Sequence, residues 1–272
     1  MVVDQKYNIS SYLFGLEPHF GCCTSNFNQA WPKFALSTFM TTDKGIACTA
    51  IAPSEVETVL NDGTVKISLS TDYPFNNILK FTVSVDKPLD FNFDIRIPGF
   101  CSSARVNGEE AICGEYYNLS KTWIGEEIIE VVLNYETVFI NRPEDKVAVR
   151  RGPLLYSIAI EEEWNMIDYG KDEELRVYPH CDYEVLPHSQ WNYGYVDKNI
   201  EYMFNGIGDI PFNPKESPIE ASASVVEINW PKNNGIVARV PVDQPISEVK
   251  TVKLLPYGCT NLRMTEIPFI EI

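Results

Sequence analysis

Hydrophobic and polar residues alternate over much of the chain after residue 45, which is typical of β-strands with one buried face. The clearest case is "DFNFDIRIPGF", whose alternating apolar residues are Phe91, Phe93, Ile95 and Ile97. Two segments predict β-hairpins, one turning at Asn61-Asp62-Gly63 and one at Asn107-Gly108. Asn or Asp before Gly tolerates the positive φ of a tight turn. Short strands at regular intervals predict a sandwich or barrel.

One convincing helix precedes these strands. After the cap-type residues Thr24 and Ser25, apolar residues recur near helical spacing at Phe27, Trp31, Phe34, Ala35 and Phe39. They predict a helix with one wide apolar face. Pro32 is expected to kink or shorten this helix because it lacks an N–H donor and clashes with the preceding turn. Asp43-Lys44-Gly45 is expected to end it.

The second half of the chain is less regular. "EIIEVVLNYETVFI" predicts a long strand or a pair, and "VAVRRGPLLYSIAI" predicts two strands around Gly152-Pro153. Residues 165–220 are rich in Asn, Asp, Tyr and Pro, with few clear periods. Strands resume at "ASASVVEINW", and "VKTVKLLPYG" lies near the end. The predicted fold class is mainly β, with two β-sandwich (jelly-roll-like) domains.

Charge and cysteine content narrow the classes of partner and compartment. The chain of 272 residues has a formal net charge of −16, which disfavours nucleic acid and anionic membranes and leaves neutral partners as the default. Neither a signal peptide nor an apolar run of membrane-spanning length is visible. Seven scattered cysteines suggest mostly free thiols and a reducing, cytoplasmic location.

The adjacent pair Cys22-Cys23 in "EPHFGCCTSN" has several interpretations from the residues alone. Burial as small apolar residues is the most common fate of such a pair, and a strained vicinal disulfide is rarer. A zinc site takes about four ligands, usually from more than one segment. His19 is the only histidine close in sequence, since His180 and His188 are distant. The remaining cysteines stand alone at Cys48, Cys101, Cys113, Cys181 and Cys259.

Other candidate chemistry is weaker. Glycoside hydrolysis needs two carboxylates across a cleft, and no acidic pair is singled out by its context. "EEEW" at 161–164 and "KDEEL" at 171–175 are interpreted as solvated surface. The aromatic residues of "WNYGY" at 191–195 could stack on sugars, but packing against a sheet is favoured.

An ordered set of motifs resembles the zinc-dependent β-L-arabinofuranosidases of glycoside hydrolase family 127. These motifs are "GCCTSNFNQAWPKF", "STDYPF", "IRIPGF", "ARVNGE", "GEYYNLSKTW", "VAVRRGPLLYSI", "WNYG" and "LPYGCTNLRMTEIPF". The resemblance covers nearly the whole chain and implies the end of a catalytic (α/α)6 barrel followed by β-sandwiches. It also implies that Cys22 is the nucleophile and a zinc ligand, that Cys23 is a zinc ligand, and that the substrate is an arabinofuranoside. A metal-bound thiolate is held ready for nucleophilic displacement.

Upstream of the cysteine pair, the sequence differs from the family pattern. The remaining zinc ligands, the acid/base glutamate and the sugar-binding histidines of the family come from segments that this sequence does not contain. The expected organisation is therefore a barrel remnant at 1–44, a first sandwich at 45–145 with a return strand at 248–272, and a second sandwich at 146–247. Because no acid is present to protonate the leaving group, the chain alone is expected to be an inactive accessory part with weak zinc binding. A stand-alone carbohydrate-binding module and a structural or assembly role are the alternatives.

Overall fold

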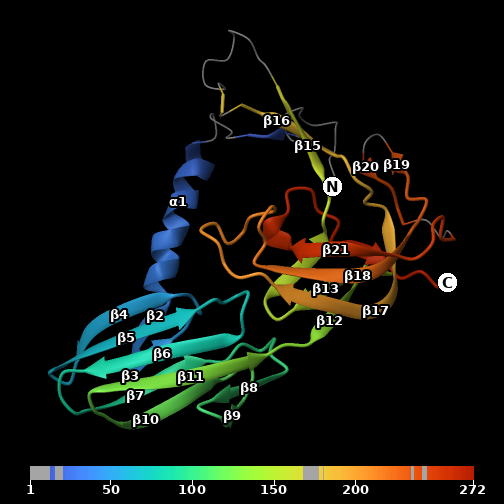
Figure 1. The fold of residues 1–272 in the computed structure, drawn as a ribbon. Helices are drawn as coiled ribbons and strands as arrows, with labels where there is room; N and C mark the ends of the chain where they lie inside the picture. The colour runs from blue at the N-terminus through green and yellow to red at the C-terminus, as the bar shows by residue number, and fades with distance from the viewer. Residues whose placement is uncertain (1–12, 16–20, 168–177, 180, 234–235, 241–243) are drawn as a thin grey trace. The chain divides into compact units, whose positions relative to one another are not determined.

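The computed structural model describes residues 13–15, 21–167, 178–179, 181–233, 236–240 and 244–272. Two compact units are present. The first β-unit comprises Cys22–Glu136 and Arg151–Pro153, and the second β-unit comprises the described residues of Met1–Gly21, Thr137–Arg150 and Leu154–Ile272. Both consist mainly of strands, so the predicted mainly β fold class is confirmed (Figure 1).

Helix α1 spans Gly21–Leu36 and is shorter at its end than predicted. It continues past Pro32 but stops before Phe39, which lies in strand β2 (Phe39–Thr42) and is buried. Strand β2 pairs with β3 (Gly45–Cys48) across Asp43 and Lys44, so these residues form a hairpin turn and do not end the helix. The sandwich therefore begins before residue 45, because Phe39 gains more from burial in its core than from an exposed helical turn.

Two sheets pack face to face in the first β-unit (Figure 1). The four-stranded sheet has the order β10-β7-β3-β2, where β7 is Leu89–Arg96 and β10 is Tyr116–Trp123. The six-stranded sheet has the order β4-β5-β6-β11-β8-β9. Its strands are Ser54–Leu60, Gly63–Thr71, Ile78–Val85, Glu126–Asn134, Ser103–Val106 and Glu109–Ala111 in that order. Neighbouring strands are antiparallel except β3 and β7, which are parallel.

The core of this sandwich follows from the alternation in the sequence. All of the alternating apolar residues of "DFNFDIRIPGF" are buried, and Phe93 packs edge-on against Phe81 of the opposite sheet at 5.3 Å between ring centroids. Both predicted hairpins form. Asn61 and Asp62 have positive φ between β4 and β5, and Asn107 and Gly108 have positive φ between β8 and β9.

The second β-unit is built on a seven-stranded sheet with the main order β12-β13-β14-β21-β18-β17, in which β22 also pairs with β13. Its strands are Thr137–Arg142, Lys146–Arg151, Leu154–Ile158, Lys250–Pro256, Ile219–Glu227, Tyr193–Phe204 and Glu266–Pro268. A three-stranded sheet has the order β1-β16-β15, formed by Leu13–Phe14, Tyr183–Pro187 and Glu162–Met166. Strands β19 (Lys232–Asn233) and β20 (Ile236–Val237) form a small hairpin.

The predicted return of residues 248–272 to the first sandwich is wrong. Strand β21 lies inside the second β-unit, between β14 and β18, and β22 pairs with β13 of the same sheet. Leu254 and Leu255 are buried there. The chain leaves the first unit near Thr137, so the predicted boundary at residue 145 also lies too late. "EIIEVVLNYETVFI" is thus a pair of strands, β11 and β12, that belong to different units.

The 12-residue strand β17 lies within the segment that showed few clear periods. Its register shifts between Tyr195 and Ile200, which breaks the alternation that would have identified it. Within the part of the chain that the structure describes, no helix combines the length and apolar character that a membrane crossing requires.

Candidate functional site

The cysteine pair lies at the start of helix α1. Cys22 is exposed in the first turn, where unpaired backbone N–H groups favour a negatively charged side chain. Its carbonyl oxygen accepts a 2.7 Å hydrogen bond from the Asn26 amide one turn later. Cys23 is in the helix, but its side chain lies outside the described residues. The exposure of Cys22 argues against the interpretation of this residue as a buried apolar thiol.

The described residues do not complete a zinc site. Cys22 offers one thiol, and the side chain of Cys23 is not described. No group of three or more His, Cys, Asp or Glu side chains that could hold a metal ion occurs among the described residues. His19 lies outside them. The pair therefore offers at most part of the ligand set that tetrahedral zinc requires.

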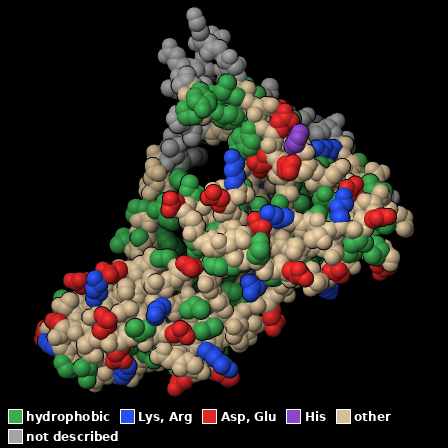
Figure 2. All heavy atoms as spheres, in the orientation of Figure 1, with side chains coloured by type: hydrophobic (Ala, Val, Ile, Leu, Met, Phe, Trp, Pro, Cys, Tyr) green, Lys and Arg blue, Asp and Glu red, His purple; other side chains and the backbone are tan. Residues whose placement is uncertain are grey.

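One face of helix α1 is apolar and exposed. Its exposed side chains are Phe27 (69%), Trp31 (69%) and Phe34 (42%). Trp31 and Phe34 meet edge-on with 6.4 Å between ring centroids, as residues three apart on a helix do. Hydrophobic side chains come to the surface along this helix in Figure 2. An apolar face of this size is typical of a surface that another element covers.

Most other described cysteines are structural. Cys48, Cys101, Cys181 and Cys259 are buried free thiols, and Cys113 is half-buried. Burial raises the pKa of Cys48 and of Cys101 to about 12. Burial also raises the pKa of Cys259. A raised pKa keeps a thiol protonated at neutral pH, and the protonated form is a poor nucleophile.

We expect Cys22 to react with iodoacetamide at pH 8 at least about 10-fold faster than Cys48 or Cys101, because Cys22 is exposed whereas Cys48 and Cys101 are buried and burial raises their pKa. Timed alkylation followed by peptide mass spectrometry measures the three rates. Equal rates in the native state would contradict the assignment of Cys22 as the accessible thiol, and equal rates in guanidinium are the control.

The aromatic motif "WNYGY" packs against the protein, as favoured from the sequence. Tyr193 and Tyr195 are buried in β17, and Tyr195 meets Phe139 and Phe269 at 5.9 and 5.8 Å between ring centroids. Trp191 is half-buried and lies 6.1 Å from Trp230. Rings held this way cannot serve together as a flat platform for sugars.

A feature that sequence reasoning missed surrounds "EEEW". Glu161 and Glu163 are exposed, as expected for solvated surface, but Glu162 is half-buried. Its carboxylate accepts hydrogen bonds from the Leu262 backbone N–H at 2.9 Å, the Asn261 amide at 3.0 Å and the Trp164 indole N–H at 3.0 Å. Nothing local in the sequence predicts the bonds to Asn261 and Leu262, which lie 99 and 100 residues away along the chain. "KDEEL" lies outside the described residues.

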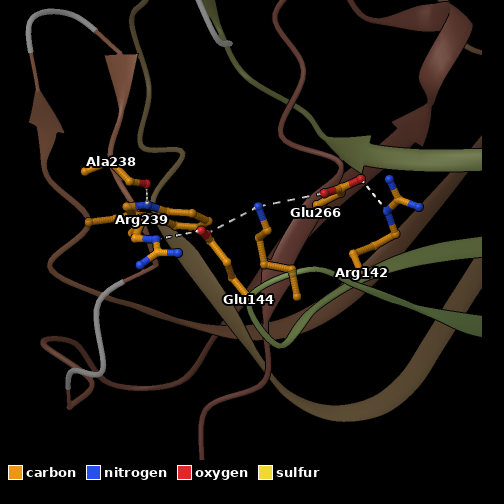
Figure 3. A network of polar contacts seen from close by, with 7 residues as sticks. Arg142, Glu144, Ala238, Arg239 and Glu266 are labelled. Carbon is orange, nitrogen blue, oxygen red and sulfur yellow. Dashed lines mark hydrogen bonds and ion pairs between the residues drawn. The ribbon is translucent and has the colours of Figure 1, made fainter.

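A second polar cluster joins strands of the second β-unit (Figure 3). Arg142 donates to Glu266 at 2.6 Å, and Arg239 donates to Glu144 at 3.1 Å. The ammonium of Lys146 lies 3.8 Å from both carboxylates. Glu144 and Arg239 also line a hollow of about 490 Å³. Because each charged side chain has a partner of opposite charge, the cluster is best explained as a set of ion pairs that stabilises the packing of β12, β13 and β22.

These features define the class of protein as a β-rich chain whose first unit is a sandwich preceded by an exposed helix. Residues 45–135 match the middle domain of the family 127 β-L-arabinofuranosidases. The resemblance that the sequence motifs indicate is thereby confirmed. No curated protein matches the sequence.

Solved structures share the fold over more than nine-tenths of the chain. A family 127 β-L-arabinofuranosidase from Geobacillus stearothermophilus T6 superposes with a TM-score of 0.61 over 92% of this chain, at 20% identity. A protein described as a glycoside hydrolase gives a TM-score of 0.66 over 99% of the chain, at 17% identity. Another family 127 β-arabinofuranosidase gives 0.60 over 91%, at 15% identity. The chain covers 37%, 43% and 38% of these proteins, respectively.

Proposed function

We propose that this chain is the C-terminal accessory part of a retaining, zinc-dependent glycoside hydrolase that acts on arabinofuranosides. The observation that carries the proposal is the match of residues 45–135 to the family 127 middle domain. Solved family 127 β-arabinofuranosidases share the fold over more than nine-tenths of the chain. The chain spans only about two-fifths of their length, so a catalytic barrel from residues outside this sequence completes the enzyme in this proposal.

Cys22 carries the reactive group in this proposal. Its exposed thiol at the start of helix α1 attacks the anomeric carbon of the sugar, and Cys23 contributes to metal binding. The remaining metal ligands and the acid that protonates the leaving oxygen belong to the barrel. A zinc ion bound there would hold the thiolate form of its cysteine ligands. Because that acid belongs to the barrel in this proposal, the chain by itself is expected to be inactive.

The apolar face of helix α1 is the surface that the barrel covers in this account. We expect the purified chain, which lacks that cover, to self-associate at concentrations of tens of micromolar. Replacing Trp31 with Glu is expected to shift light scattering toward the monomer, because the charge disrupts the exposed face that Phe27 and Phe34 share with it.

The matched control is Trp164→Ala, which removes an exposed tryptophan of the second β-unit and should leave self-association unchanged. A wild-type chain that is monomeric at every concentration would show that the helix face needs no partner. That result would remove the docking role from the proposal.

A further inference from the structure

A groove of about 930 Å³ lies on the second β-unit, beside the strand that carries "EEEW". It is lined by residues of β14, β15, β17 and β21 and by parts of the segments before β17, between β17 and β18, and after β21. Its walls offer both an aromatic surface and hydrogen-bonding groups, including Trp164, Tyr193, Gln190, Ser189 and Asn261. Ligand sites combine apolar walls with a few placed polar groups in this way.

Trp164 is exposed but fixed in place. Its side chain is 45% exposed, and its indole N–H donates to Glu162. Phe14 and Tyr183 flank its ring, with centroids 5.6 and 5.8 Å away. A large aromatic side chain that is already immobilised loses little conformational entropy when a ligand stacks on it. The surrounding contacts therefore hold an exposed apolar ring at the groove wall without covering it.

Hydrogen bonds also join the segments that form the walls of the groove. Glu162 ties β15 to Asn261 and Leu262, which follow β21. The backbone N–H of Glu161 donates to the Ser189 hydroxyl, and its carbonyl accepts from the backbone N–H of His188. These bonds join the walls that belong to different segments, so the groove does not need to form when a ligand arrives.

Charge in the groove favours a neutral ligand. Among the lining residues, Glu162 is matched in sign by Lys253, which also pairs with Glu220 at 2.8 Å. Glu161 and Lys215 contribute one charge of each sign to the lining. A ligand with an apolar face, hydroxyl groups on its edge and no net charge matches these walls, and a sugar chain has all of these properties.

We propose that this groove binds a neutral oligosaccharide that contains arabinofuranose, with Trp164 as the stacking surface. The choice of sugar rests on the proposed function, whereas the place of binding rests on the groove itself. The site holds substrate chains near the enzyme without taking part in the reaction. Tyr193 of "WNYGY" also lines the groove but is buried, so the exposed ring at this wall is that of Trp164.

Isothermal titration of the full chain with an arabinofuranose hexasaccharide tests the proposal, with cellohexaose as the comparison sugar. We expect saturable binding of the arabinose chain with a Kd on the order of 0.1–1 mM. Trp164→Ala is expected to weaken binding about 10-fold or more, and Trp164→Phe is expected to retain part of it. Trp31→Glu, on helix α1, is the matched control and should bind as the wild type does.

Absence of binding, preference for cellohexaose, or equal affinity of Trp164→Ala would overturn the proposal. Far-ultraviolet circular dichroism of each variant verifies its fold, and Trp164→Phe decides the outcome if Trp164→Ala does not fold. The light-scattering result for Trp31→Glu does not depend on this groove. Failure of the groove and failure of the proposed function are therefore distinguishable.

Discussion

Ending the chain after Ser247 is expected to unfold the second β-unit and to leave the first one folded. Strand β21 (Lys250–Pro256) lies between β14 and β18, and its removal exposes the edges of both strands. Leu254 and Leu255, which are buried, are lost with it. A sheet that loses an interior strand loses its backbone hydrogen bonds and its core contacts together, so little of its stability remains.

Denaturant unfolding followed by circular dichroism and by proteolysis measures this effect. The full chain is expected to show a transition from each unit, and the shortened chain only the transition of residues 22–136. Trypsin should then cut the shortened chain within residues 154–247 and spare the first sandwich. If the first sandwich were lost instead, residues 248–272 would belong to it, and the strand pairing described here would be wrong.

Phe93→Ala is expected to affect the first sandwich and to leave the second β-unit unchanged. The expected loss in the free energy of unfolding of the first sandwich is about 3–5 kcal/mol, the usual cost of such a truncation in a core. Phe93 is completely buried in β7. Its ring meets Phe81 at 5.3 Å and Trp123 at 6.4 Å between centroids, so the change opens a cavity between the two sheets. That cost is a large share of the stability of a domain of ordinary size.

Ile128→Ala is the matched control, because Ile128 is an exposed residue of strand β11 in the same sandwich. In this variant, the free energy of unfolding of the first sandwich should change by less than about 1 kcal/mol, because the substitution alters only the strand propensity of an exposed position. A similar loss in both variants would mean that Phe93 does not occupy a packed core position.

Most strands and turns of the first sandwich could be predicted from the sequence, but its bounds could not. Apolar and polar residues alternate along its strands because one face of each strand is buried. The turns at Asn61 and Asn107 need positive φ, and residues that tolerate positive φ occupy them. Phe39 was misassigned because its spacing from Phe34 and Ala35 also fits a helix. Only its burial against the sheets decides for a strand, and local periodicity does not contain that information.

The second β-unit could be predicted only in part. Strand β17 contains a register shift that hides its period, and the sheet that includes β21 joins segments separated by many residues. Which sheet the final strand joins depends on long-range packing. The family resemblance suggested the first sandwich, and the hydrogen-bond register places the strand in the second unit.

The candidate site, too, could be predicted where it depends on local sequence and could not where it depends on contacts between distant segments. Motif order identified Cys22 as the residue of interest, and the structure adds that it is exposed at a helix start. The groove beside Trp164 could not be predicted, because Glu162 looks like one acid among several until its bonds to Asn261 and Leu262 are seen. The walls of the groove are brought together by contacts between segments that are distant in the sequence.

Hydrolysis of p-nitrophenyl β-L-arabinofuranoside tests the central claim most directly. The purified chain is assayed with excess zinc beside Cys22→Ala and beside a complete family 127 enzyme as the positive control. We predict release of nitrophenol by the complete enzyme and none above the blank by this chain or its variant, because the proposed function assigns the acid that protonates the leaving group to the barrel. Turnover by the chain that disappears in Cys22→Ala would contradict the account, since it would show a complete active site within these 272 residues.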